Sequence, residues 1–80
     1  MFYVYVIKSE MDGRLYKGFT ANLDQRIKEH NSRKTKSTKA YIPWKLVYFE
    51  EFLKREDAIK REKYFKSGSG REFLKTKLVI

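Results

Sequence analysis

Hydrophobic residues near the amino terminus of the chain form an unbroken run. Every residue from Phe2 to Ile7 is aromatic or β-branched, which predicts a β-strand. Alternate side chains of a strand point to opposite faces, and both faces of this one are apolar, so we expect it to lie in the centre of a sheet. Asp12 and Gly13 are typical of a hairpin turn, and a strand from Arg14 to Phe19 is predicted as the antiparallel partner.

A helical pattern begins soon after the hairpin. Asn22 is a favourable N-cap, and Gln25 stands three residues later, as in a capping box. We predict a helix from Leu23 to about Asn31. Leu23 and Ile27 lie one turn apart and form its buried stripe.

The second half of the chain predicts one further strand and further helices. Residues 32–40 are polar and basic, which indicates an exposed loop. Pro43 has no N–H to donate and suits the start of a strand, which is predicted from Lys45 to Glu50. A second long helix is predicted from Leu53 to Lys66.

The end of the chain completes the predicted fold. Ser69 and Glu72 are spaced as in a second capping box and predict a short third helix. The apolar residues 78–80 are predicted to pack back onto the core. The predicted order is β-β-α-β-α-α, an α/β (α+β) fold with a three-stranded, mostly antiparallel sheet flanked by helices. Eighty residues leave no room for a second core, so a single domain over residues 1–80 is predicted.

The charge of the chain favours a nucleic-acid partner. Nineteen Lys and Arg residues stand against ten Asp and Glu residues, a formal charge of +9, and aromatic residues are interleaved with them. An anionic membrane surface and a basic adaptor for another protein are the alternatives. The sequence has no cysteine, no signal-peptide pattern and no apolar run of membrane-spanning length. We therefore expect a cytoplasmic protein with no membrane partner.

One acidic residue on the second long helix needs an explanation. Glu62 falls inside the apolar arc that includes Ala58 and Phe65. A carboxylate placed there needs a cationic partner, a metal ion or a catalytic role. The alternative is that Glu62 turns outward and pairs with Lys66, four residues later.

Two tyrosines and one flank of the first helix are further candidates. Arg26 and His30 lie one turn apart, and both can face the first two strands. Taken singly, each is ordinary: a solvated arginine, a histidine near a helix end. Tyr5 and Tyr16 are equally compatible with plain core aromatics. Their combination is more specific.

The order of these residues resembles the GIY-YIG nuclease superfamily. Tyr3-Val4-Tyr5 is followed, after ten residues, by Tyr16-Lys17-Gly18 and then by a helix that carries Arg26. The runs at residues 43–48 and 61–66 also resemble those of small stand-alone members, which are similar to the N-terminal nuclease domain of excinucleases. Tyr3 and Lys17 stand where the family motif has Gly and Ile.

The resemblance implies phosphodiester cleavage with one divalent metal ion, Mg²⁺ or Mn²⁺, and no small-molecule cofactor. Glu62 matches the family's metal ligand, and the residues that match catalytic positions are Tyr5, Tyr16, Arg26, His30 and Glu62. Arg26 can fork onto phosphate oxygens, and one carboxylate is enough for Mg²⁺, which keeps several waters. By ordinary pKa His30 is the better proton acceptor, and a tyrosine would position the water; which group takes the proton stays open.

Basic residues predict how a substrate is held. Contacts to backbone phosphates are expected from Lys17, Arg33, Lys34, Lys36 and Lys39. Tyr41 or Trp44 could stack on an unpaired base, although we favour Trp44 as a core residue. We thus predict a metal-dependent endonuclease that hydrolyses DNA, selects structure rather than sequence, and acts on branched, flapped or damaged sites, as in DNA repair. The alternative is an inactive nucleic-acid-binding module on the same fold.

Overall fold

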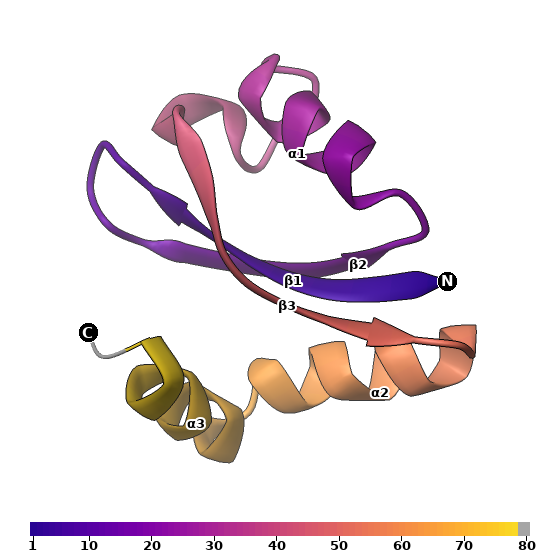
Figure 1. Cartoon of the computed structure of the whole chain (residues 1–80). Coiled ribbons are helices and arrows are strands. Elements are labelled where there is room, and N and C mark those ends of the chain that lie inside the picture. The colour runs from indigo at the N-terminus through magenta and orange to yellow at the C-terminus, as the bar shows by residue number, and fades with distance from the viewer. Residues whose placement is uncertain (79–80) are drawn as a thin grey trace.

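A computed structural model describes residues 1–78, in which a three-stranded sheet is packed between helices (Figure 1). In chain order the elements are β1 (Phe2–Ser9), β2 (Leu15–Thr20), α1 (Leu23–Asn31), the 3₁₀ turn η1 (Lys39–Tyr41), β3 (Trp44–Phe52), α2 (Arg55–Phe65) and α3 (Gly68–Leu78). β1 lies between β2 and β3 and pairs with both in antiparallel register. The predicted order and the central place of the first strand are confirmed.

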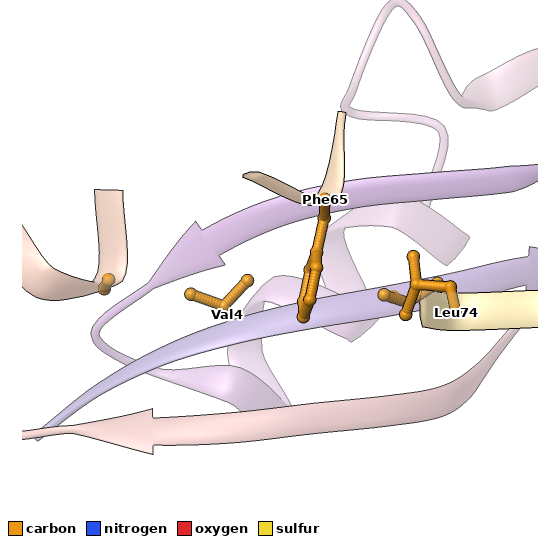
Figure 2. Close-up of a cluster of buried hydrophobic side chains, with 5 residues drawn as sticks. Val4, Phe65 and Leu74 are labelled. Atoms are coloured by element: carbon orange, nitrogen blue, oxygen red, sulfur yellow. The ribbon is translucent and has the colours of Figure 1, made fainter. Parts of the chain in front are cut away.

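Helices cover both faces of the sheet: α1 lies over one, and α2 and α3 lie over the other (Figure 1). The core beneath α2 and α3 consists of Val4, Val6, Ala58, Phe65 and Leu74 (Figure 2). The core beneath α1 consists of Tyr5, Ile7 and Trp44. Alternate residues of β1 thus serve the two cores, as its apolar pattern predicts. Within the described residues, no helix is long and apolar enough to cross a lipid bilayer.

The start of α1 agrees with its predicted cap, but only half of the capping box forms. Asn22 Oδ1 accepts a hydrogen bond from the backbone N–H of Gln25 at 3.1 Å. The Gln25 side chain does not return this bond. Its amide nitrogen lies 3.5 Å from a Glu29 oxygen, and the Asn22 N–H donates to the Thr20 hydroxyl instead.

The start of α2 differs from the prediction. The helix begins at Arg55 rather than at Leu53, because β3 continues to Phe52 and Lys54 keeps an extended backbone. Leu53 is left 82% exposed at the corner between strand and helix.

The start of α3 also differs. The helix begins at Gly68 and runs for eleven residues, so it is not short. Ser67 Oγ accepts a hydrogen bond from the Gly70 N–H at 3.2 Å and fills the capping role two residues before Ser69. The predicted capping box of Ser69 and Glu72 is therefore wrong. Leu78 packs against the core beneath α2 and α3, whereas the other two residues of the predicted apolar end, 79 and 80, lie outside the described part of the chain.

An ion pair ties β3 to α2. Arg61 Nε donates to one carboxylate oxygen of Glu50 at 2.8 Å, and the Tyr48 hydroxyl donates to the other. Burial and the adjacent carboxylate raise the pKa of Tyr48 to about 12, so this phenol keeps its proton and Glu50 keeps a hydrogen-bond donor. The charge of Glu50 is thus neutralised by a residue of α2, the helix that covers this face of the sheet.

The contact between α2 and α3 yields a prediction. A Cβ on Gly70 would lie 1.8 Å from the carbonyl oxygen of Tyr64 and 2.6 Å from the Cα of Phe65. Gly70→Ala should force the helices apart and lower the free energy of unfolding by about 1–3 kcal/mol, as overpacking does. Urea denaturation measures this change.

Gly68 of the same helix is the matched control. A Cβ there would meet no atom within 4 Å, so Gly68→Ala should be neutral or stabilising by up to about 1 kcal/mol. Equal effects of the two substitutions would show that the close approach at Gly70 does not hold α3 in place.

Candidate active site

The hydroxyl of Tyr5 lies at the centre of the candidate site. Tyr5 is 1% exposed, and it stands opposite Gly18 in the β1–β2 ladder. A Cβ on Gly18 would lie 2.6 Å from Tyr5 Oη, so the phenol occupies the space that a side chain on β2 would need. The glycine that ends the second tyrosine motif therefore makes room for the tyrosine that ends the first.

His30 binds the Tyr5 hydroxyl from the last turn of α1. The His30 side chain is fully buried, with Nε2 2.8 Å from Tyr5 Oη and Nδ1 2.9 Å from Thr38 Oγ1. The Thr38 hydroxyl donates to the carbonyl oxygen of Thr35 at 3.4 Å, so it accepts from His30 Nδ1–H. This assigns the lone pair to Nε2, where the Tyr5 hydroxyl donates. Burial, followed by the charge of Arg26, lowers the pKa of His30 to about 4. The ordinary pKa that favoured His30 as the proton acceptor therefore does not hold in the folded chain.

Arg26 approaches the same phenol from one turn earlier in α1. Its Nε donates to Tyr5 Oη at 3.4 Å, and its Nη1 donates to Glu29 Oε1 at 2.9 Å. These two hydrogen bonds raise the pKa of Arg26. Burial raises the pKa of Tyr5, and the hydrogen bond from Arg26 partly opposes that rise. Near neutral pH the site therefore holds a neutral phenol, a neutral imidazole and a guanidinium ion.

Tyr16 lies beside this group on β2. Its ring centroid is 5.0 Å from that of His30, in an edge-on arrangement, and 6.5 Å from that of Tyr5. Its side chain is half-buried and packs against Trp44. The structure thus brings together four of the five predicted catalytic residues around one hydroxyl group.

Glu62 belongs to α2, in the layer opposite α1. Its charge makes a small contribution to the raised pKa of Tyr5, behind burial and the effects of Arg26 and Tyr16. Its side chain is only 18% exposed, and its carboxylate lies 3.6 Å from Lys66 Nζ. The alternative pairing with Lys66 is therefore present, while the acid remains sheltered instead of turning to bulk solvent.

A divalent metal ion is compatible with this acid. Within residues 1–78 no group of three His, Cys, Asp or Glu side chains is placed to share a metal ion. Mg²⁺ does not need such a group, because it keeps several waters and often takes one or two protein carboxylates. Glu62, whose ion pair is long and single, is the residue here that would hold it.

The predicted phosphate-binding residues fall on two separate parts of the molecule. Arg33, Lys34, Lys36 and Lys39 are exposed on the segment that follows α1. Lys34 is near enough to Glu29 for its charge to help lower the pKa of that carboxyl, behind the hydrogen bonds from Arg26 and Gln25. Lys17 points to the other face of the sheet, beneath α2 and α3.

Trp44 takes the core role that we favoured for it. It is 5% exposed, and its Nε1–H donates to the carbonyl oxygen of Thr38 at 2.8 Å. Tyr41 lies beneath the guanidinium of Arg14, 3.6 Å from the ring centroid. Base stacking is therefore not available at Trp44.

Thr38 is the functional candidate that sequence reasoning missed. It is one of several hydroxyl residues in a polar, basic segment, and nothing in that composition sets it apart. Only the turn of the chain between Thr35 and Tyr41 buries it against His30. A single Ser or Thr in this segment would have pointed to the hydrogen-bond partner of the one histidine, but the segment contains several.

This fold and this set of residues define a class of protein. The chain matches the model of the GIY-YIG catalytic domain over residues 1–76, and it belongs to the GIY-YIG family, a family of nuclease domains. The predicted family is thus confirmed.

Among its relatives are UPF0213 proteins of several bacteria. The protein from Bacillus licheniformis is 45% identical over 68 residues, which cover 84% of this chain and 69% of that one. The protein from Clostridium perfringens is 48% identical over 67 residues, covering 82% and 71%. The solution NMR structure of a UPF0213 protein from Bacillus halodurans matches with a TM-score of 0.58 at 36% identity, covering 95% of this chain and 84% of that one.

The buried imidazole predicts a loss of stability in mild acid. The pKa of His30 is about 4 in the folded chain against 6.5 for the free side chain, so between these values the unfolded chain binds more protons. The free energy of unfolding should fall by roughly 2–3 kcal/mol as the pH drops from 7 to 4. Urea denaturation at a series of pH values measures this slope.

His30→Gln provides the comparison, because it removes the titrating group. Whatever its overall stability, this variant should show a flatter slope between pH 6.5 and 4.5. An identical slope in both proteins would assign the acid sensitivity to other groups.

Proposed function

We propose that this protein is a metal-dependent endonuclease that hydrolyses DNA phosphodiester bonds and selects its substrate by structure. One observation carries the proposal: a single phenol hydroxyl is hydrogen-bonded to both a buried imidazole and a guanidinium. The sheltered carboxylate of Glu62, whose charge acts weakly on this phenol, supports it. Membership of a nuclease family supports the reaction class. The lack of cysteine fits a reducing compartment, so we place this activity in the cytoplasm.

Arg26 would bind the phosphate under attack. Its Nε and Nη1 are used by Tyr5 and Glu29, and Nη2 makes no hydrogen bond within the described residues. A guanidinium held by two such contacts is preorganised, so it stabilises negative charge on a non-bridging oxygen without reorganising during the reaction.

Tyr5 and His30 would remove the proton of the attacking water. Because His30 Nε2 is already occupied by Tyr5, the imidazole cannot contact the water directly. The water proton would go to Tyr5 Oη while the Tyr5 proton goes to His30 Nε2, leaving an imidazolium whose Nδ1–H donates to Thr38. Burial keeps both groups neutral in the free protein, so this transfer belongs to the step in which the water attacks phosphorus.

Glu62 would hold the divalent metal ion. Bound there, Mg²⁺ or Mn²⁺ would stabilise charge on the leaving 3′ oxygen. Lys66, the present partner of the carboxylate, lies on the exposed side of α2 and can turn toward a phosphate when it is displaced. Tyr16 is left to position the water at the rim of the site.

A nicking assay tests this proposal. Purified protein with Mg²⁺ or Mn²⁺ should nick supercoiled DNA and cut branched or flapped duplexes in preference to plain linear duplex. Glu62→Gln and Arg26→Ala should each reduce the rate by about 10³-fold or more, since one removes the metal ligand and the other the charge on the phosphate. Lys60→Gln, on the other side of α2, is the control and should nick at the normal rate.

The outcomes are distinct. Nicking that survives Glu62→Gln would refute the assignment of the carboxylate. Salt-sensitive binding without nicking under any divalent metal would support the alternative, an inactive nucleic-acid-binding module.

The hydrogen bond to Thr38 gives a separate test of the proton path. Thr38→Val keeps the shape of the side chain but removes the acceptor of Nδ1–H, so the imidazole can take the other tautomer. We expect kcat to fall by about tenfold to a hundredfold with little change in KM.

Thr38→Ser restores the hydroxyl and should recover most of the rate. A merely structural role would predict similar losses in both variants, with matching changes in thermal stability.

A further inference from the structure

A cavity of about 350 Å³ lies between the edge strand β2 and α3, on the sheet face opposite α1. We call it the β2–α3 groove. Its lining residues are Gly13, Leu15, Lys17, Arg71, Leu74 and Lys75. Two leucines supply an apolar floor, and three cationic side chains supply the walls. None of these six residues is acidic.

The cations of the groove repel one another with little compensation. Burial lowers the pKa of Lys17, and the charges of Arg71 and Lys66 lower it further. Within residues 1–78 neither Lys17 nor Arg71 forms an ion pair, while Lys75 lies 3.6 Å from a Glu72 oxygen in an exposed pair. An anion placed among these side chains would relieve the repulsion.

The fold fixes the points from which the cationic side chains project. Arg71 and Lys75 lie one turn apart on the same flank of α3, and Lys17 projects from β2. α3 cannot slide, because Gly70 lies directly against the backbone of α2 and Leu74 is buried in the core. Side chains carried by a packed helix and strand lose less backbone entropy on binding a charged ligand than those of a flexible loop do.

The groove lies on the opposite face of β2 from the phenols, and the charge of Lys66 links it to Glu62 of the candidate active site. Lys17 is the residue between Tyr16 and Gly18, on the reverse side of β2 from the phenols. Lys66 joins the two places, since it lies 3.6 Å from Glu62 and its charge acts on Lys17. Positive charge therefore runs from the carboxylate along β2 to α3.

We propose that the β2–α3 groove binds the sugar–phosphate backbone of the nucleic-acid strand next to the scissile bond. Its position at the active site rests on the proposed nuclease function. A backbone suits the groove because three cations span an edge strand and a helical turn, and because no group there is arranged to read bases. The exposed segment of residues 33–39 would then contact a different part of the substrate.

The salt dependence of DNA binding tests this inference. Fluorescence anisotropy with a labelled branched duplex is measured in EDTA, with Glu62→Gln in every protein so that nothing is cleaved. The groove variant carries Lys17→Gln, Arg71→Gln and Lys75→Gln. The slope of log K against log salt should become shallower by about 2–3, because each lost phosphate contact removes roughly 0.9.

The control variant removes the same charge from the opposite edge of the sheet. It carries Lys45→Gln on β3, Lys60→Gln beside Phe52 of β3, and Lys77→Gln near Glu50 of β3. Its slope should change by less than about 0.5, since these side chains contact no phosphate. Equal changes in the two variants would overturn the groove, because net charge alone would then explain binding.

A second variant and a second measurement support the test. Arg71 and Lys75 are exposed, so the double variant Arg71→Gln and Lys75→Gln replaces the triple variant if the triple variant does not fold. In NMR titration of the Glu62→Gln protein, amide shifts should concentrate in β2 and the first half of α3. Shifts confined to residues 32–40 would refute the groove.

The groove and the nuclease function can fail separately. Binding that maps to β2 and α3 without nicking under any metal would retain the groove and refute the nuclease. If Glu62→Gln abolishes nicking but the groove variant binds DNA with an unchanged salt dependence, the nuclease function is retained and the groove is refuted.

Discussion

The hydrogen bond between the Tyr5 hydroxyl and His30 Nε2 is the contact on which the candidate site depends. Both side chains are removed from water, so each needs the other as a hydrogen-bond partner. The contact forms only because Gly18 leaves space on β2 and Thr38 takes the second ring nitrogen. A β-strand, a helix and a loop thus meet at one bond, and none of them can shift without leaving a buried polar atom unsatisfied.

In the proposed reaction, Tyr5 and Glu62 belong to opposite layers of the fold. α1 and α2 cover different faces of the sheet, and a central strand would separate their side chains completely (Figure 1). β2 is an edge strand, so a ligand lying along it can reach both layers. Gly18 has no side chain at the place where the Tyr5 hydroxyl lies against β2. The phenol therefore feels the charge of Glu62 from the far layer as well as that of Arg26 from its own.

The sequence predicts the architecture well because local patterns determine it. The apolar run of β1 and the cap at Asn22 place their elements correctly. The two tyrosine motifs, Arg26 and His30 converge as their resemblance to the family implied. The errors lie at boundaries where two local signals compete. By residue type Ser67 and Ser69 are equally suitable N-caps, but in the folded chain Ser67 caps the Gly70 N–H, where Gly70 packs against α2.

What the sequence cannot show are properties that arise from long-range burial. His30 has an ordinary pKa in the unfolded chain, and its low value in the folded protein comes from the core that closes around it. Thr38 is indistinguishable from its neighbours until η1 turns it inward. Such features depend on contacts between residues far apart in the chain, which no local pattern encodes.

The ion pair of Glu50 with Arg61 has an effect beyond its contribution to stability. β3 carries two glutamates and one lysine, and Arg61 is held by Glu50, whereas β2 carries a lysine and no acid. The acids of β3 therefore offset part of the positive charge at that edge, and no acid does so on β2. Such an asymmetry steers a polyanion toward β2 during encounter, and the effect is strongest at low ionic strength.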